Sequence, residues 1–404
     1  MPPYLTEDLP GIGGIIKDQV QDFQVEELPL YPPSGAGEHT FFEIQKVGLS
    51  TYQAVGAVAK ALDVPSKTIG YAGLKDAHAI TCQVLSVHGV SPDRVAALDL
   101  PKIKVLWAER HKNKLKIGHL RGNRFFIRIR GVEEQAMPAC QAILDVLERR
   151  GVPNWYGPQR FGNRGDSAVL GRAVVSKDTE GFIRLWLGHP HPAESPALQR
   201  ARTLFDAGQW QEALNLFPGG MADERRALQA LLRTEGDFQR AYASVPKRLK
   251  VFLLSAYQSA LFNRVLEERL QSLDRVYAGD LAVKHPGRSV FRVEDEKVEQ
   301  RRAEQFEISP SGPIFGYKMM QAEGSQGELE RSLLASEGLE LEDFRLGGGI
   351  RAKGTRRALR FALREPELAY DAGIVLRFWL PSGCYATAVL AELTKVPWQS
   401  EERA

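Results

Sequence analysis

A polar segment between two short apolar runs constrains the fold of this chain most strongly. The runs extend from Thr68 to Ala72 and from Val84 to Val87. Both are rich in β-branched and aromatic residues, which is typical of strands. The segment between them starts at Gly73 and contains the adjacent pair Lys75 and Asp76. The sequence therefore predicts a Lys-Asp pair on a loop between two strands, a common location for chemistry. Taken alone, this stretch is also explained by a surface turn in which Asp76 bonds its own backbone.

Length and composition set the class of protein. With 404 residues the chain is too long for one ordinary core, so two or three domains are expected. Hydrophobic residues make up 43% and charged residues 25%, as in a soluble globular protein. No stretch approaches the roughly 18 consecutive apolar residues of a membrane helix. The first residues lack the features of a secretory signal. We therefore expect a cytoplasmic protein with no membrane partner.

The pattern of strands and helices predicts a mixed or antiparallel sheet accompanied by helices. Early strands are expected at residues 15–17, 23–27 and 39–45, and a helix capped by Ser50 or Thr51 follows them. A second helix, from Glu133 to Arg150, ends before Gly151-Val152-Pro153, which marks a domain junction. Further helices are expected over residues 196–240 and 251–270, and a strand at 373–380 precedes a last helix at 385–393.

One segment is strongly basic although the net charge of the chain is only +3. Between Lys102 and Arg130 ten basic residues accompany a single acid, Glu109. Lysines at every second position from Lys112 to Lys116 predict a strand with one cationic face. Such a face is the electrostatic footprint of a polyanion-binding protein. A solvated surface that keeps the protein soluble is the alternative explanation.

A second segment, from Asn154 to Asp166, mixes aromatic residues, glycines and the arginines Arg160 and Arg164. This composition suits stacking on bases and contacts with phosphates. An ordered loop with its aromatic rings tucked beneath it would have the same composition.

Familiar cofactor and metal motifs are missing from the sequence. The three cysteines are far apart, which argues against a disulfide framework and a Cys-based zinc site. Only His189 and His191 are close together among eight histidines, and a proline separates them. The glycines from Gly11 to Gly14 do not complete a dinucleotide fingerprint. We therefore expect no metal and no organic cofactor. What remains is Asp76, which can act as a nucleophile or a base where nearby cations keep it ionised.

The segment from Gly73 to Gln83 resembles a family signature. It is similar to the G-x-K-D-x-x-A-x-T-x-Q segment of the TruD family of tRNA pseudouridine synthases, which carries a catalytic aspartate. Other segments resemble the family in the same order: residues 120–125, 152–162, 255–263, 312–316 and 377–383. The resemblance spans nearly the whole chain.

The resemblance implies a fold and an activity. The fold would be α+β, with a mixed or antiparallel-sheet pseudouridine synthase catalytic domain (residues 1–150 and 356–404) split by an inserted α+β TRUD domain (residues 151–355). The activity would be isomerisation of uridine to pseudouridine at position 13 of tRNA, without metal or organic cofactor. We expect a monomer whose partner is tRNA.

The resemblance also implies roles for individual residues. Asp76 would be the nucleophile, attacking C1′ of the ribose or C6 of the uracil. Lys17 would keep the Asp76 carboxylate ionised, and Asn123 matches an active-site asparagine. Phe125 matches a ring that stacks on the target base, although strand alternation assigns Phe125 to the core; both roles stay open. Apart from the resemblance, Lys75 is the sequence neighbour of Asp76 and should point in a different direction, so we expect it to make a backbone or phosphate contact. The expected RNA-binding residues are Lys75, Lys112, Lys114, Lys116, Arg121, Arg124, Arg160 and Arg164.

Two other functions are compatible with the basic segments. A non-catalytic RNA-binding protein or RNA chaperone would use the same cationic face and would not need Asp76. An RNA methyltransferase would need a pocket for a methyl donor.

Overall fold

The computed structural model describes residues 3–287 and 289–396, which form two compact units. The first, here called the sheet unit, contains residues 3–152 and 361–396. The second, the helical unit, contains residues 153–287 and 289–360. The assignment of these units as a catalytic and an inserted domain stays a prediction.

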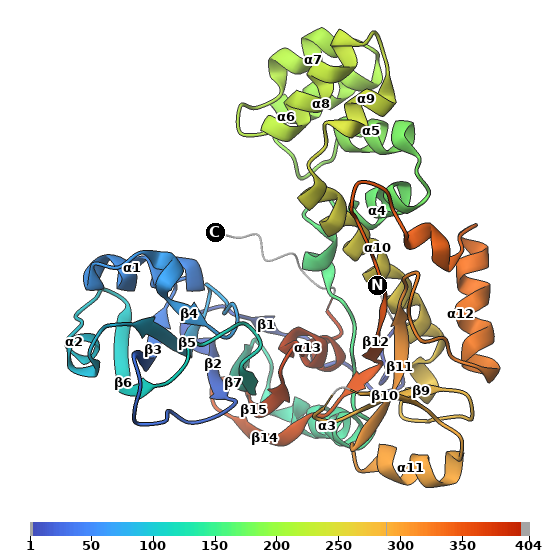
Figure 1. The fold of residues 1–404 in the computed structure, drawn as a ribbon. Coiled ribbons are helices and arrows are strands. Elements are labelled where there is room, and N and C mark those ends of the chain that lie inside the picture. The colour runs from blue at the N-terminus through green and yellow to red at the C-terminus, as the bar shows by residue number, and fades with distance from the viewer. Residues whose placement is uncertain (1–2, 288, 397–404) are drawn as a thin grey trace. The chain divides into compact units, whose positions relative to one another are not determined.

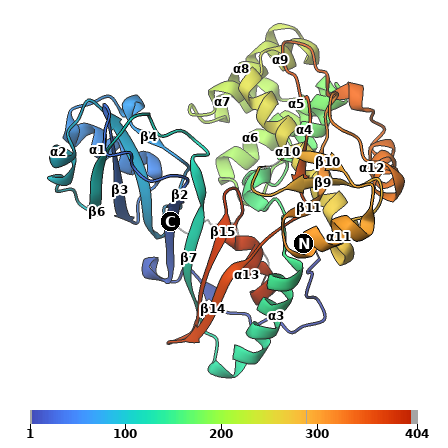
Figure 2. The same cartoon turned by 60° about the horizontal axis from the view of Figure 1, so that its bottom comes forward.

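The sheet unit is built on a nine-stranded sheet (Figures 1 and 2). Its strands are β1 (Ile15–Ile16), β2 (Phe23–Pro29), β3 (His39–Val47), β4 (Gly70–Tyr71), β5 (Ile80–His88), β6 (Ile103–His111), β7 (Leu120–Arg130), β14 (Arg364–Tyr370) and β15 (Ile374–Pro381). Their order is β14-β15-β7-β2-β5-β3-β6, with β1 paired to β7 and β4 to β5. Strands β2 and β5 run parallel, whereas the other described pairs in this sheet are antiparallel. The mixed sheet expected from the sequence is confirmed.

Four α-helices pack on this sheet. They are α1 (Thr51–Leu62), α2 (Pro92–Ala96), α3 (Met137–Arg150) and α13 (Ala386–Thr394). Ser50 caps α1, because its side chain accepts a hydrogen bond from the backbone N of Gln53 at 3.2 Å. The apolar side of α1 packs through Val58 and Leu62 against fully buried Ile44 of β3. Truncating a leucine at such a position costs about 2 to 5 kcal/mol. In Figure 2, α3 and α13 lie beside β14 and β15.

Residues 112–119 form a loop rather than the cationic strand expected from their alternation. This segment, here called the lysine loop, is held by Leu115, whose N donates to Ser86 Oγ at 3.0 Å, and by Gly118, whose N donates to the Ala72 carbonyl at 2.8 Å. The loop passes so close to β4 that a Cβ added at Gly70 would lie 2.4 Å from the Leu115 carbonyl oxygen. In a strand, Leu115 and Ile117 would both lie on the face opposite the lysines. Instead Leu115 is buried and Ile117 is 77% exposed.

The helical unit combines helices with a small antiparallel sheet. Its α-helices are α4 (Ser167–Val175), α5 (Thr179–Leu187), α6 (Pro196–Asp206), α7 (Trp210–Leu216), α8 (Ala222–Arg233), α9 (Phe238–Ala243), α10 (Lys247–Glu268), α11 (Glu296–Glu304) and α12 (Gly324–Ser336). Its four-stranded sheet has the order β10 (Val290–Arg292), β9 (Leu281–Lys284), β11 (Ile308–Ile314) and β12 (Thr355–Ala358). The helices expected over residues 196–240 and 251–270 are confirmed.

The remaining elements are short. β8 (Val152–Pro153) pairs with β13 (Arg360–Phe361). The 3₁₀ helices are η1 (Val20–Asp22), η2 (Ser66–Thr68), η3 (Glu134–Ala136), η4 (Pro158–Phe161), η5 (Leu270–Ser272) and η6 (Leu341–Phe344). Among the described helices, none is long and apolar enough to cross a membrane.

Candidate active site

Asp76 lies on the loop between β4 and β5, as the sequence predicts. This segment, residues 72–79, is here called the Lys-Asp loop. Oδ1 of Asp76 accepts a hydrogen bond from the backbone N of His78 at 2.9 Å, and Oδ2 accepts one from Nζ of Lys17. The side chains of Lys17 and Asp76 are 12% and 25% exposed. The carboxylate is therefore paired and still accessible from solvent.

The backbone at Lys17 has an uncommon conformation. Lys17 follows β1, whose pairing with β7 fixes it on the sheet, and its φ angle is +59°. A non-glycine residue in this left-handed region costs roughly 1 to 2 kcal/mol. Gly14 allows the preceding turn, since a Cβ there would lie 2.5 Å from side-chain atoms of Ile129 and Val132. The backbone is therefore strained at Lys17, the residue whose ammonium bonds Asp76.

The electrostatics of the pair favour an ionised carboxylate. Burial by itself would raise the pKa of Asp76. The hydrogen bond and charge of Lys17, helped by the backbone N–H of His78 and the charge of Lys46, outweigh burial and lower this pKa. Asp76 is therefore an anion at neutral pH, which is the state that a nucleophile or a base requires.

Lys75 points in a different direction from Asp76. Its Nζ lies 2.8 Å from Oε2 of Glu27 and donates to Oδ1 of Asn123 at 2.5 Å. The side chains of Lys75 and Glu27 are only 5% and 1% exposed. Burial raises the pKa of Glu27 even though the charge of Lys75 opposes it. The ammonium of Lys75 is thus buried under the loop, and the backbone or phosphate contact expected for Lys75 stays a prediction.

The sheet brings these groups onto one face. Glu27 on β2 pairs with Asn123 on β7, and Lys46 on β3 pairs with Thr81 on β5. Thr81 also pairs with Val25, two residues before Glu27. Because alternate residues of a strand share a face, these polar side chains lie on the same side of the sheet. The Lys-Asp loop crosses this side.

Lys46 and Thr51 fix the backbone of the Lys-Asp loop. Lys46 is fully buried, and its Nζ donates to the carbonyl oxygen of Asp76 at 2.8 Å. Burial lowers the pKa of Lys46 to about 8. Oγ1 of Thr51 accepts from the backbone N of Lys75 at 2.8 Å and bonds Oε1 of Gln83 at 3.0 Å. Neither residue was among the site residues predicted from the sequence. Lys46 could have been found, because a lysine at an inward-facing position of a strand is unusual.

Phe125 is in the core of the sheet unit. It follows Asn123 by two residues on β7 and is 7% exposed. Its ring centroid lies 6.2 Å from that of Phe23 and 5.5 Å from that of Phe378. The Phe23 ring in turn contacts Nζ of Lys17, which lies 4.7 Å from its centroid. The burial expected from strand alternation is confirmed, and the stacking role stays a prediction.

Several basic residues of β7 are neutralised by distant acids. Arg124 pairs with Glu26 at 3.3 Å, and Arg130 pairs with buried Asp22 at 2.6 Å. Arg128 lies 3.7 Å from Asp22. The charge excess read from the sequence is therefore partly cancelled in the fold. Arg121 is exposed, and its guanidinium lies 5.5 Å from the centroid of the Trp379 ring.

Arg160 and Arg164 belong to the helical unit and make internal contacts. Nε of Arg160 donates to Oγ of Ser259 at 3.0 Å. Nε of Arg164 lies 3.0 Å from Oδ2 of Asp166. Their contacts with RNA stay predictions. Within residues 3–287 and 289–396, no group of three or more histidine, cysteine, aspartate or glutamate side chains could hold a metal ion.

Comparison with known proteins first defines the class. The chain superposes on a crystal structure from Methanosarcina mazei, described as a candidate tRNA pseudouridine synthase D (TruD), with a TM-score of 0.87. The two sequences are 28% identical, and the match covers 98% of this chain and 96% of that one. The fold is therefore the α+β fold of a pseudouridine synthase, an enzyme of the isomerase class.

Sequence comparison then gives the family. Residues 1–393 match the family model described as tRNA pseudouridine synthase D (TruD). A tRNA pseudouridine synthase D from Geobacter metallireducens is 50% identical over 393 residues, which cover 97% of each chain. One from Geobacter sulfurreducens is 48% identical over 395 residues, covering 98% of this chain and 97% of the relative. The chain belongs to the TruD family of tRNA pseudouridine synthases.

Proposed function

We propose that this enzyme isomerises uridine at position 13 of tRNA and that Asp76 is its nucleophile. Membership of the family makes uridine in tRNA the substrate; the position and the nucleophile are the proposal. One observation carries it: the Asp76 carboxylate is accessible, and Lys17 holds it ionised on the Lys-Asp loop. The product is an isomer of the substrate, so the reaction involves no net oxidation or reduction.

The proposed reaction has two candidate first steps at the same carboxylate. Asp76 attacks either C1′, and the uracil departs with the electron pair of the C1′–N1 bond, or C6, and the electron pair moves into the uracil ring. In either route the C1′–N1 bond breaks and leaves its electron pair on N1, and the uracil then turns and forms a bond from C5 to C1′. Loss of the C5 proton, gain of a proton at N1 and release of the aspartate complete the isomerisation. A carboxylate has about four lone-pair sites, so the hydrogen bonds from Lys17 and His78 leave it able to attack.

Asn123 is proposed to orient the uracil. An ammonium can only donate hydrogen bonds, so Lys75 holds the amide with its oxygen toward Lys75 and its NH₂ group pointing away. The NH₂ group can then donate to a carbonyl oxygen of the uracil. The uridine must leave its stack to reach the site. Phe125 lies on the same strand face as Asn123. We assign to its ring the stacking contact that replaces the base stacking lost when the uridine leaves the RNA helix.

We assign the chemistry to the sheet unit, which contains Asp76, Lys17, Asn123 and Phe125. The sheet unit would then be the split catalytic domain, and the helical unit the inserted domain. An RNA-binding protein without catalysis is the second candidate function. It is not favoured, because it gives no reason for an accessible, ionised aspartate beside a strained lysine.

The test is to incubate the protein with unmodified tRNA and to map pseudouridine through its carbodiimide adduct. A stop of reverse transcription at position 13 is the expected result. Modification confined to another uridine would contradict the assigned position, and the absence of any modified uridine would contradict the proposed function.

A further inference from the structure

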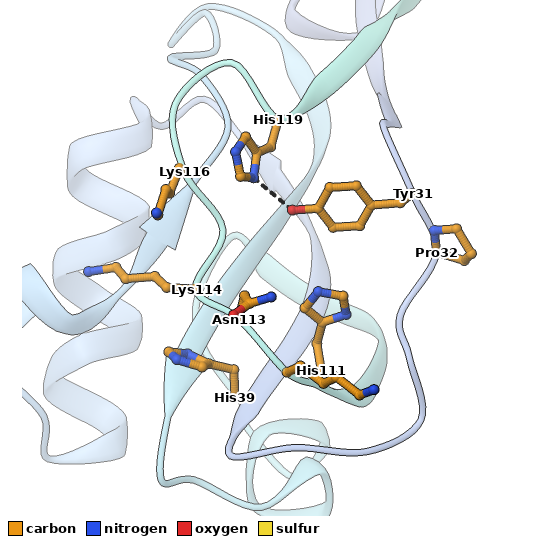
Figure 3. Close-up of a pocket in the computed structure, with 9 residues that line it drawn as sticks. Tyr31, Pro32, His39, His111, Asn113, Lys114, Lys116 and His119 are labelled. Atoms are coloured by element: carbon orange, nitrogen blue, oxygen red, sulfur yellow. Dashed lines mark hydrogen bonds between the residues drawn. The ribbon is translucent and has the colours of Figure 1, made fainter.

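A polar pocket lies in the sheet unit, away from Asp76 (Figure 3). Its volume is about 670 Å³, within the range of roughly 300 to 1,000 Å³ typical of sites for small ligands. The segment after β2, the first residue of β3, the last residue of β6 and the lysine loop line it. Figure 3 shows the rings of Tyr31, His111 and His119 close together, with Lys114 and Lys116 on the other side.

The wall of the pocket offers rings and hydrogen-bonding groups. Oη of Tyr31 bonds Nδ1 of His119 at 2.7 Å, and the Tyr31 ring stacks on His111 with a centroid distance of 5.4 Å. The backbone N of Ser34 donates to Nδ1 of His111 at 3.2 Å, so Nε2 carries the proton in the neutral ring. Among the described residues, Nδ1 of His39 is buried without a hydrogen-bond partner.

The charge of the pocket is entirely positive. Lys112, Lys114 and Lys116 line it, and no carboxylate does. None of the three forms an ion pair among the described residues; Lys114 donates only to the carbonyl of Lys67, at 2.7 Å. This contrasts with the arginines of β7, which acids neutralise. Three unpaired lysines beside imidazole rings favour an anion with an aromatic group, as in a nucleotide.

The pocket and Asp76 lie at opposite ends of the same strands. His39 and Val47 are the first and last residues of β3, and Val47 pairs with Ile80, just after the Lys-Asp loop. Eight steps along a strand span roughly 27 Å, at about 3.4 Å per residue. The lysine loop connects the two places, since Gly118 bonds Ala72 of the Lys-Asp loop.

We propose that this pocket binds a phosphate-bearing nucleotide of the tRNA other than the uridine being isomerised. The lysines contact its phosphate, and the imidazole and phenol groups contact its base or sugar. The proposal rests on the proposed function in that it takes RNA as the ligand. A free nucleotide has the same chemistry, but membership of a tRNA-modifying family favours RNA.

The test compares Lys112→Gln/Lys116→Gln with a matched control, Lys60→Gln/Lys297→Gln. All four lysines are exposed and form no ion pair among the described residues. The dissociation constant of tRNA is measured by fluorescence anisotropy over a series of salt concentrations. Loss of two phosphate contacts is expected to weaken binding about tenfold at moderate salt and to lower the slope of log K against log salt by about 2. The control is expected to match the wild type.

A second variant tests the pocket wall. His39→Phe keeps an aromatic ring and removes a nitrogen that has no protein partner. It is expected to fold normally and to bind tRNA about fivefold more weakly, because one neutral hydrogen bond of the imidazole to the base or sugar is lost.

Two results would overturn the proposal. One is a Lys112→Gln/Lys116→Gln variant whose tRNA affinity and salt slope equal those of the control. The other is binding of AMP that this variant loses while its tRNA affinity is unchanged, which would assign the pocket to a free nucleotide. Mapping on the wild type separates the two proposals: weaker tRNA binding by the variant supports the pocket even if position 13 is not modified.

Discussion

Replacing Lys17 by methionine tests how the site keeps Asp76 ionised. Methionine keeps an unbranched side chain beside Phe23 and the same left-handed backbone, and it removes the charge. The pair is 12% and 25% exposed. It therefore lies between surface pairs, worth at most about 1 kcal/mol, and buried pairs, whose disruption costs about 3 to 5 kcal/mol. We expect the substitution to remove about 2 kcal/mol of interaction with the ionised carboxylate. At 1.36 kcal/mol per unit, this raises the pKa of Asp76 by about 1.5 units.

The direction of the change follows from the structure. Burial raises the pKa of Asp76, and Lys17 is the main group that opposes burial. Without Lys17 the carboxylate is protonated at higher pH, so the acid limb of kcat/KM moves upward. The ratio of wild-type to variant activity should grow as pH falls, to a limit of about 30-fold. Single-turnover release of tritium from C5 of the tRNA uridine measures the rate at each pH.

A different pH profile would refute this reasoning. If Lys17→Met reduces kcat/KM by the same factor at every pH, Lys17 does not act by keeping the carboxylate ionised. Lys17→Arg is the matched control, because it keeps a cation and should retain the wild-type acid limb.

Three further predictions concern stability. Lys17→Gly removes the strain of the left-handed backbone at this position. Its free energy of unfolding, measured in urea, should be about 1 kcal/mol higher than that of Lys17→Met. Glu27→Gln removes the counter-charge of buried Lys75 and should lower the free energy of unfolding by about 3 kcal/mol. Gly70→Ala places a Cβ 2.4 Å from the Leu115 carbonyl oxygen and should cost about 1 to 3 kcal/mol and weaken tRNA binding by displacing the lysine loop.

Each of these predictions has a contrary outcome. Equal stability of the glycine and methionine variants would show that the backbone at Lys17 is not strained. An unchanged free energy for Glu27→Gln would contradict a buried ion pair with Lys75. Wild-type tRNA affinity in Gly70→Ala would contradict a role of the lysine loop in binding.

Local signals in the sequence predicted the elements that depend on near neighbours. Ser50 and the apolar spacing of Val58 and Leu62 define α1 within one segment, so the helix and its cap could be found. Short apolar runs on both sides of Gly73 likewise placed the Lys-Asp loop. The position of Lys17 beside Asp76 came from family resemblance, because the two are 59 positions apart in the chain and no local pattern links them.

The groups beneath the loop could not be found in this way. Glu27 meets Lys75 and Asn123 only because β2 and β7 pair in one register, and register depends on contacts between distant segments. The same holds for Arg130, whose partner Asp22 is far away in sequence. The lysine loop was mistaken for a strand because alternation alone does not supply the neighbouring strand that a ladder needs.

The most direct test of the proposed nucleophile is single-turnover conversion of tRNA by Asp76→Asn, with binding measured on the same protein. The variant keeps the size of the side chain and removes the attacking anion. Asp18→Asn, the same change at a 47% exposed aspartate beside Lys17, is the control and should be active. We predict no pseudouridine from Asp76→Asn and a tRNA affinity close to that of the wild type. Formation of pseudouridine by this variant would contradict the assignment of Asp76 as the nucleophile.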